Sequence, residues 1–189
     1  MTTKAQHLTI ADWDSMPHGD GNRYEIIEGE LFKSDWPGLT HQRVLTNLLG
    51  LLGRFVNAAK IGEVVPNPPL ILSDDTAVLP DVVYFTNEQC ETLIRDDRLV
   101  GPPTLVVEVV SPGIEDIARD CKIKLDLYFQ HTVPEYWLVY PKTFTVERHV
   151  YQGSPLLRLD TLRCDDSLST AILPGFSCKV SEIFRPVGK

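Results

Sequence analysis

The chain of 189 residues lacks the segments that direct a protein into or across a membrane. No apolar run approaches the roughly 20 residues that a membrane-spanning helix requires. The N-terminal stretch MTTKAQHLTIADWDSMPHGDGN has no apolar core like that of a signal peptide. We therefore expect a soluble, cytoplasmic protein without a membrane partner.

Cysteine pairs with metal-binding spacing are also missing. The four cysteines show neither a CxxC spacing nor a nearby pair of histidines, which argues against a structural zinc site and favours reduced thiols. The chain contains no internal repeat, low-complexity tract or linker. With 43% hydrophobic and 23% charged residues its composition is that of a globular protein, and its length predicts one domain over residues 1–189.

Basic residues are in the minority, with 18 Lys and Arg against 26 Asp and Glu, a net charge of −8 and a pI near 5.1. Affinity for phosphate comes from lysine and arginine, so this balance argues against a general nucleic-acid-binding surface. It does not exclude an acidic metal site that acts on nucleic acid. If nucleic acid binds, we expect it to approach the basic group Arg95, Arg98, Arg119, Lys122 and Lys124; the alternative is that these are scattered, solvated charges.

Hydrophobic periodicity predicts alternating helices and strands along the whole chain. In chain order the pattern predicts a short helix within 8–17 that Thr9 caps, a hairpin over 23–34, an amphipathic helix over 40–60, several short strands within 63–85, a polar and at most partly helical segment over 88–103, a core strand at 104–111, a second helix over 114–131, a strand at 135–141, a hairpin over 145–162 that turns at 152–154, and a short strand and helical turn within 173–184. This mixture predicts an α/β fold in which a mixed β-sheet is flanked by two main helices.

The stretch LVVEVVSPG places one carboxylate, Glu108, inside a run of valines. Such a run predicts a buried strand, where a charge is costly unless it is paired or binds a metal. Asp81, in LPDVVYF, begins another strand, and two carboxylates on neighbouring strands can hold a hard divalent cation such as magnesium. The structural alternative is that Glu108 pairs with a buried lysine or caps a backbone group, and that Pro-Asp is only a turn.

The helix that follows carries two lysines on different faces. At about 100° per residue, Lys124 lies in the arc that faces the sheet, whereas Lys122 points toward solvent. Asp120 precedes Lys124 by four residues, so the two side chains can touch. A lysine on the buried face can orient a metal-bound water and stabilise developing negative charge. The alternative is a buried ion pair with a snorkelling lysine.

Several motifs in a fixed order resemble the Uma-type family of restriction endonucleases, a branch of the PD-(D/E)XK nuclease superfamily. They are YEIIEGEL, HQRV, LPDVVYF, LVVEVVSP, the spacing of Asp120, Lys124 and Tyr128, and VPEYWLVYP. The resemblance extends from about Thr9 to Phe184. It implies a restriction-endonuclease-like fold, a central mixed β-sheet flanked by two main α-helices with extra N-terminal and C-terminal hairpins, and magnesium-dependent phosphodiester hydrolysis.

The resemblance also assigns roles to individual residues. Asp81 matches the aspartate of the Pro-Asp motif and Glu108 the second acidic residue, so both are implied metal ligands. The superfamily lysine usually lies two residues after that acid, where this chain has Val110. The resemblance therefore points to Lys124 on the following helix. The chain departs from the family in reading SPG after Glu108, which puts substrate contacts of that loop in doubt, and VYP after the late strand.

Other candidates have weaker support. His41 begins the long helix and matches a histidine common in the family; it could contact phosphate or water, or be structural. Glu28, at the predicted hairpin tip, could be a distal metal ligand or only a turn residue. Trp137 and Tyr136 are predicted to be core residues rather than base-stacking ones, and we expect Tyr128 to lie in the core beside Lys124.

Three functions are compatible with these residues. The first is a magnesium-dependent DNA endonuclease, with manganese as a possible substitute, in which Asp81 and Glu108 hold the ion and Lys124 acts on the water or the developing charge. The second is a catalytically inactive binding or assembly module with the nuclease fold, which the acidic net charge favours. The third is hydrolysis of RNA or a small phosphodiester at the same site. Cleavage of both DNA strands would need two sites and hence a homodimer.

Overall fold

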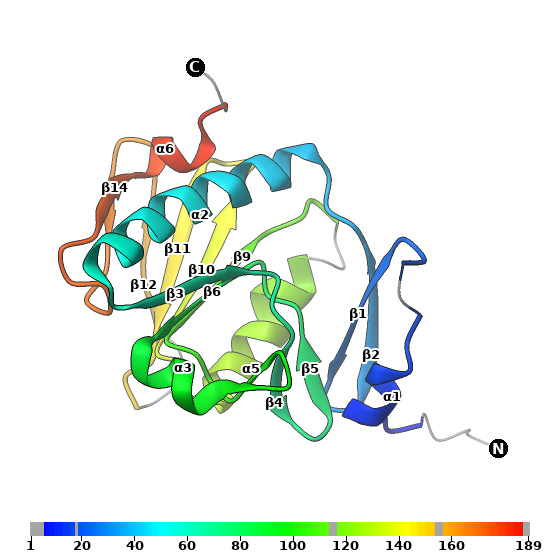
Figure 1. Cartoon of the computed structure of the whole chain (residues 1–189). Helices are drawn as coiled ribbons and strands as arrows, with labels where there is room; N and C mark the ends of the chain where they lie inside the picture. The colour runs from blue at the N-terminus through cyan, green and yellow to red at the C-terminus, as the bar shows by residue number, and fades with distance from the viewer. Residues whose placement is uncertain (1–5, 18, 114–116, 154–156, 187–189) are drawn as a thin grey trace.

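A computed structural model describes residues 6–17, 19–113, 117–153 and 157–186 (Figure 1). The helical elements are α1 (Ile10–Asp14), α2 (Leu39–Ala59), α3 (Asn87–Leu93), the π-helical turn η1 (Arg119–Ile123), α5 (Lys124–Gln130) and α6 (Val180–Phe184). The strands are β1 (Asn22–Ile27), β2 (Glu30–Asp35), β3 (Gly62–Pro66), β4 (Leu70–Ser73), β5 (Thr76–Val78), β6 (Val82–Thr86), β7 (Ile94–Arg95), β8 (Arg98–Val100), β9 (Leu105–Val109), β10 (Glu135–Tyr140), β11 (Thr145–Val150), β12 (Leu157–Leu162), β13 (Ser167–Ser169) and β14 (Ser177–Lys179). None of the helices in these described ranges is long and apolar enough to cross a membrane.

The central sheet has the strand order β12-β11-β10-β9-β6-β3. Strands β9 and β10 are parallel, and the other neighbouring pairs are antiparallel. A parallel pair needs a crossover connection, and η1 with α5 supplies it. This is the mixed sheet that the sequence predicted, flanked by α2 on one side and by α5 on the other (Figure 1).

Helix α2 covers one face of the central sheet with an apolar stripe. Its buried side chains recur at three- and four-residue spacing, as an amphipathic helix requires, and include Leu48 and Leu52. They pack in one hydrophobic cluster with Val107 of β9 and Trp137 of β10. The helix ends at Lys60, whose left-handed backbone donates its N–H to the carbonyl of Val56.

A second sheet, of order β2-β1-β5-β4-β8-β7, stands beside α5 (Figure 1). Its residues Ile27 and Leu70 share a hydrophobic cluster with Leu127 of α5 and Val106 of β9. The predicted N-terminal hairpin is therefore confirmed as β1 and β2, and it forms part of a six-stranded sheet. This arrangement brings β1 next to the face of the central sheet that α5 covers, so residues from both sheets can meet there.

The segment 88–103 is partly helical, as predicted, but its pair of strands was not predicted. It contains α3 and the antiparallel pair β7–β8. Thr86 accepts a hydrogen bond from the backbone of Gln89, and the Gln89 side chain accepts one from the backbone of Thr86. This reciprocal capping box fixes the start of α3. Parts of two other predicted elements, residues 114–116 of the second helix and Ser154 of the late turn, lie outside the described residues.

Candidate active site

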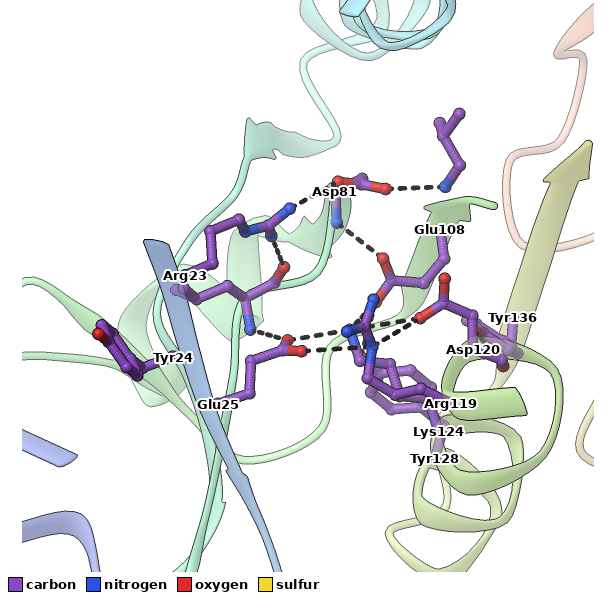
Figure 2. A network of polar contacts seen from close by, with 12 residues as sticks. Arg23, Tyr24, Glu25, Asp81, Glu108, Arg119, Asp120, Lys124, Tyr128 and Tyr136 are labelled. Atoms are coloured by element: carbon purple, nitrogen blue, oxygen red, sulfur yellow. Dashed lines mark hydrogen bonds and ion pairs between the residues drawn. The ribbon is translucent and has the colours of Figure 1, made fainter. Parts of the chain in front are cut away.

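Asp81 and Glu108 lie on the same face of the central sheet, the one toward α5. Side chains alternate along a strand, and the neighbours Val82 and Val107 belong to the cluster under α2. Both carboxylates are buried, and Oε2 of Glu108 lies 3.4 Å from the backbone nitrogen of Asp81 (Figure 2). The expectation that these two acids share one face is confirmed.

The Asp81 carboxylate is held mainly through one oxygen. Its Oδ2 accepts hydrogen bonds from Nε2 of His41 at 2.9 Å and from the backbone of Val109 at 2.8 Å. Its Oδ1 has a longer contact, 3.4 Å, with the guanidinium of Arg23. Burial alone would raise the pKa of Asp81, but the hydrogen bond and charge of His41 and the charge of Arg23 lower it. Asp81 is therefore ionised in the folded protein.

Lys124 is buried among several carboxylates, with only 2% of its surface exposed. Its Nζ lies 2.8 Å from Oε1 of Glu108 and 2.9 Å from Oε1 of Glu25, and 3.9 Å from Oδ1 of Asp120. Burial would lower the pKa of Lys124, but the charges of these three acids raise it, so the amine stays protonated. Lys122, in contrast, is exposed. The predicted orientations of both lysines are confirmed.

The five residues before Lys124, Arg119–Ile123, form a π-helical turn, where the sequence predicted a regular α-helix. The N–H of Lys124 bonds to the carbonyl of Arg119, five residues earlier. Turns of this kind occur as single insertions in α-helices and often at functional sites. This turn places Arg119 and Asp120 beside Lys124. Nε of Arg119 lies 3.2 Å from Oδ1 of Asp120 and 3.8 Å from Oε2 of Glu25.

Glu25 is a member of the cluster that sequence reasoning missed. It comes from β1 of the second sheet, and its Oε1 also accepts the backbone N–H of Leu79 at 2.7 Å (Figure 2). Burial would raise the pKa of Glu25, but Lys124, Arg119 and Arg23 lower it. The sequence did hold a signal for Glu25. Like Glu108, it is a carboxylate next to aliphatic residues of a strand, here Ile26 and Ile27.

Glu28, the acid chosen instead from the same motif, does not lie at this site. It is exposed at the tip of the β1–β2 hairpin, with a left-handed backbone (φ 51°). It lines a separate pocket together with Lys122 and Asp126. Of the two roles left open for Glu28, its position at the hairpin tip, three residues after the buried Glu25, agrees with the turn residue and not with the distal metal ligand.

We call Glu25, Asp81, Glu108 and Asp120 the carboxylate cluster. Three permanent cations, Arg23, Arg119 and Lys124, contact these four acids, so the group carries a net charge of −1 when all four acids are ionised and His41 is neutral. Burial, together with the negative charges of Asp81, Asp120 and Glu25, raises the pKa of Glu108 to about 8 despite the opposing charge of Lys124. The excess of carboxylates predicts a site that favours an added cation.

The chemistry of the donor set fits magnesium. Oδ1 of Asp81 and Oε2 of Glu108 are the two oxygens with only one long contact each. A hollow of about 30 Å³ adjoins both acids, and a water needs only about 10–15 Å³. Across the described residues, no three His, Cys, Asp or Glu side chains form a ready cage. Magnesium does not require such a cage, because it often takes one or two carboxylates and retains its waters.

His41 lies at the edge of this hollow, on the first turns of α2. Its Nε2 contacts Asp81, while its Nδ1 is buried and, in the part of the chain that the structure describes, has no hydrogen-bond partner. A buried polar atom without a partner is costly, so this nitrogen is a candidate contact for a water, or for phosphate when the ring is protonated. The two aromatic residues Trp137 and Tyr136 are fully buried, as predicted, and so is Tyr128, whose hydroxyl lies 3.4 Å from Glu108.

The family model described as "Uma2: Putative restriction endonuclease" matches residues 10–181. The chain belongs to this family. A crystal structure of a putative nuclease belonging to DUF820 from Anabaena variabilis has a TM-score of 0.75, with 14% identity over 94% of this chain and 97% of that one. At this identity the match shows a shared fold, and the restriction-endonuclease-like class expected from the sequence is confirmed.

A second solved structure, the type IIG restriction endonuclease BpuSI, gives a TM-score of 0.42 and 16% identity over 76% of this chain and 15% of that one. This similarity is too low to support an argument. No curated protein was found to match the sequence. Membership of the Uma2 family, taken with the fold, indicates a nuclease.

The basic group predicted as a docking point is dispersed in the structure. Arg119 and Lys124 are committed to the carboxylate cluster, and Lys122 lies beside Glu28. Arg98, on β8, lines a different pocket together with Arg23. The group therefore does not form one continuous basic strip.

Proposed function

We propose that the protein is a magnesium-dependent endonuclease that hydrolyses phosphodiester bonds in DNA. The observation that supports this most is the pair Asp81 and Glu108, buried on one face of the sheet beside a buried ammonium, each with one oxygen that has only a single long contact. A purely structural ion pair would not require three carboxylates around one lysine, because desolvation makes each further buried charge costly.

The residues divide the work as follows. Oδ1 of Asp81 and Oε2 of Glu108 would hold the metal, and manganese could replace magnesium because it accepts the same oxygen ligands. The bound ion would supply Lewis-acid stabilisation of the phosphate charge and a more acidic water. Lys124 keeps Glu108 near the hollow and adds a fixed positive charge that favours negative charge developing on the phosphate. His41 holds the second oxygen of Asp81 and so fixes its orientation.

DNA is the proposed substrate because the family is described by restriction endonucleases. A homodimer is part of the proposal only if both strands of a duplex are cut, since the described part of each chain holds one such site. The same chemistry could hydrolyse RNA, so the assay includes RNA of matched sequence.

The rival is a nuclease-fold module without turnover, and the net charge of −8 favours it. A cleavage assay separates the two. Labelled DNA and RNA oligonucleotides are incubated with magnesium, manganese or EDTA. We expect metal-dependent cleavage of DNA, reduced about 1,000-fold in Asp81→Asn and Glu108→Gln, the upper end of the effect of one electrostatic group. Glu28→Gln is the matched control. Folded wild-type protein that cuts nothing with either metal would favour the binding module.

A further inference from the structure

A pocket of about 320 Å³ lies next to the carboxylate cluster and shares Arg23 with it. Its walls include Trp13 of α1, Tyr24 of β1 and Trp36, which follows β2. Its volume is at the lower end of the range for small-molecule sites, about 300–1,000 Å³. We call it the aromatic pocket.

Trp36 is the most unusual residue of this wall, because 60% of its surface is exposed. Trp137, on β10 of the central sheet, is in contrast fully buried in the core. Trp36 lines the aromatic pocket, whereas its two neighbours in the sequence, Asp35 and Pro37, line the hollow beside the carboxylate cluster. An exposed tryptophan with no core to fill, placed at the entrance to a polar site, is typical of a contact for a ligand.

Two arginines already lie against the aromatic walls. The guanidinium carbon of Arg23 is 5.9 Å from the ring centroid of Trp36, and that of Arg98 is 5.6 Å from the ring of Trp13. Arg98 also pairs with Asp14 at 2.7 Å, so the charged lining residues sum to +1. In a chain with a net charge of −8, this is a local excess of positive charge beside flat apolar surfaces. Flat, polarisable and negatively charged ligands fit such a lining.

Arg23 connects this pocket to the candidate active site. The same guanidinium that lies over Trp36 contacts Oδ1 of Asp81 at 3.4 Å and donates to the carbonyl of Leu79. Figure 2 shows Arg23 next to Asp81, with Tyr24 pointing away from the carboxylates. A nucleotide whose base occupied the aromatic pocket would therefore have its phosphate on the Arg23 side, toward Asp81.

From this geometry we propose that the aromatic pocket binds one unpaired nucleobase of single-stranded DNA, next to the phosphodiester that reaches the carboxylate cluster. This inference rests on the proposed function and names its substrate class. In a duplex, both faces of a base are covered by its neighbours, and a base must be flipped out at a cost before it can enter a pocket. In a single strand the faces are free, and stacking on aromatic side chains favours every base.

The first test uses the indole N–H signals of wild-type protein in two-dimensional NMR. The chain has three tryptophans, and Trp137, whose Nε1 bonds to Glu135 in the core, is an internal control. A single-stranded oligonucleotide is added without divalent metal, so cleavage is not needed. We expect the signals of Trp13 and Trp36 to shift and that of Trp137 to stay in place. No shift at Trp36 on saturation would overturn the proposal.

The second test compares the affinities of variants by fluorescence anisotropy at low salt. Trp36→Ala should weaken binding of the single strand about 10-fold or more, whereas Trp36→Phe keeps a stacking surface and should retain most of the affinity. The matched control is Phe144→Ala, since Phe144 is also an aromatic residue with 50% exposure but lines neither hollow. Equal binding by wild type and Trp36→Ala would overturn the proposal.

Two further ligands identify the source of the base. A duplex of the same sequence should bind at least 10-fold more weakly than the single strand. If the duplex binds wild type equally well and this binding is lost in Trp36→Ala, the pocket takes a base flipped out of a duplex, and the single-strand assignment is overturned. A deoxynucleoside monophosphate should bind far more weakly than the oligonucleotide; equal affinity would indicate a free-nucleotide site instead. Binding that passes these tests without any metal-dependent cleavage would overturn the proposed endonuclease but not the base pocket.

Discussion

The two faces of β9 differ sharply although they alternate residue by residue. Val107 and Val109 pack into an apolar cluster under α2, and Glu108 between them enters a network of four acids and three permanent cations. The α2 face follows the ordinary rule that burial of apolar surface stabilises a fold. The α5 face follows the same rule at Val106 but departs from it at Glu108, and such departures are expected where a protein needs reactivity. Both faces therefore contribute to stability, and only the α5 face carries the proposed chemistry.

Removal of Lys124 should lower the stability of the protein more than any other single change on the α5 face. Lys124→Ala leaves Glu108 and Glu25 buried without their shared cation, which should cost about 3–5 kcal/mol of unfolding free energy. In protein that remains folded by circular dichroism, cleavage should fall about 100-fold or more. Lys124→Gln, which keeps a hydrogen-bond donor, is the second variant if the alanine protein unfolds.

Lys122→Ala is the matched control for this change, because Lys122 is two residues away and exposed. It should alter cleavage less than about twofold and unfolding by less than about 0.5 kcal/mol. A fully active Lys124→Ala beside an inactive Lys122→Ala would contradict the assignment of roles.

A change on the α2 face should alter stability and leave the chemistry intact. Leu48 is buried in the cluster under α2, so Leu48→Ala should lower the unfolding free energy by about 2–5 kcal/mol. Denaturant unfolding measures this loss, and cleavage by the folded fraction should stay within about twofold of wild type. A large loss of activity per folded molecule would show that the two faces are not separable.

The pH dependence of stability should carry the signature of Glu108. Its pKa is about 8 in the folded protein and about 4.3 in an unfolded chain, so between these values only the native state keeps the proton. Stability from this group is therefore full below about pH 4.3 and is lost as pH rises toward 8. Asp81 and Glu25, whose pKa values are lowered, lose their contribution only in more acidic solution.

The measurement is the melting temperature of metal-free wild type and Glu108→Gln from pH 5.5 to 8.5. The wild type should lose stability relative to the variant as pH rises, and added magnesium should reduce the difference by favouring the carboxylate. Parallel curves for the two proteins would mean that Glu108 titrates normally.

The smallest effect is expected at Glu28, which lies outside the carboxylate cluster. Glu28→Gln should change cleavage less than about twofold, whereas Glu25→Gln, three residues away and bonded to Lys124, should reduce it clearly. The assay is cleavage at saturating magnesium. The reverse order of effects would indicate that the hairpin tip, and not β1, contributes to the site.

The sequence predicted the elements whose signal is local. The continuous run of valines placed Glu108 on a buried strand, and the helical angle placed Lys124 toward the sheet. The capping box of Thr86 and Gln89 was also readable, and it was overlooked.

Other features depend on distant contacts or on backbone irregularity. Glu25 reaches Lys124 only because the second sheet stands beside α5, and β1 joins β5 through the single register pair Ile26 and Ala77. The π-helical turn at Arg119 breaks the assumption of 100° per residue, and no residue pattern in that segment announced it. The contact of Arg23 with both Asp81 and Trp36 joins three separate segments and could not be inferred from any one of them.

The central claim is that Asp81 and Glu108 together hold a divalent cation, and calorimetric titration tests it most directly. Magnesium, and then manganese, is added to metal-free wild type, Asp81→Asn and Glu28→Gln at the same pH. We predict saturable binding of either metal to wild type and Glu28→Gln, and its loss in Asp81→Asn. Equal binding by Asp81→Asn and wild type, or no binding to any of the three folded proteins, would contradict the claim.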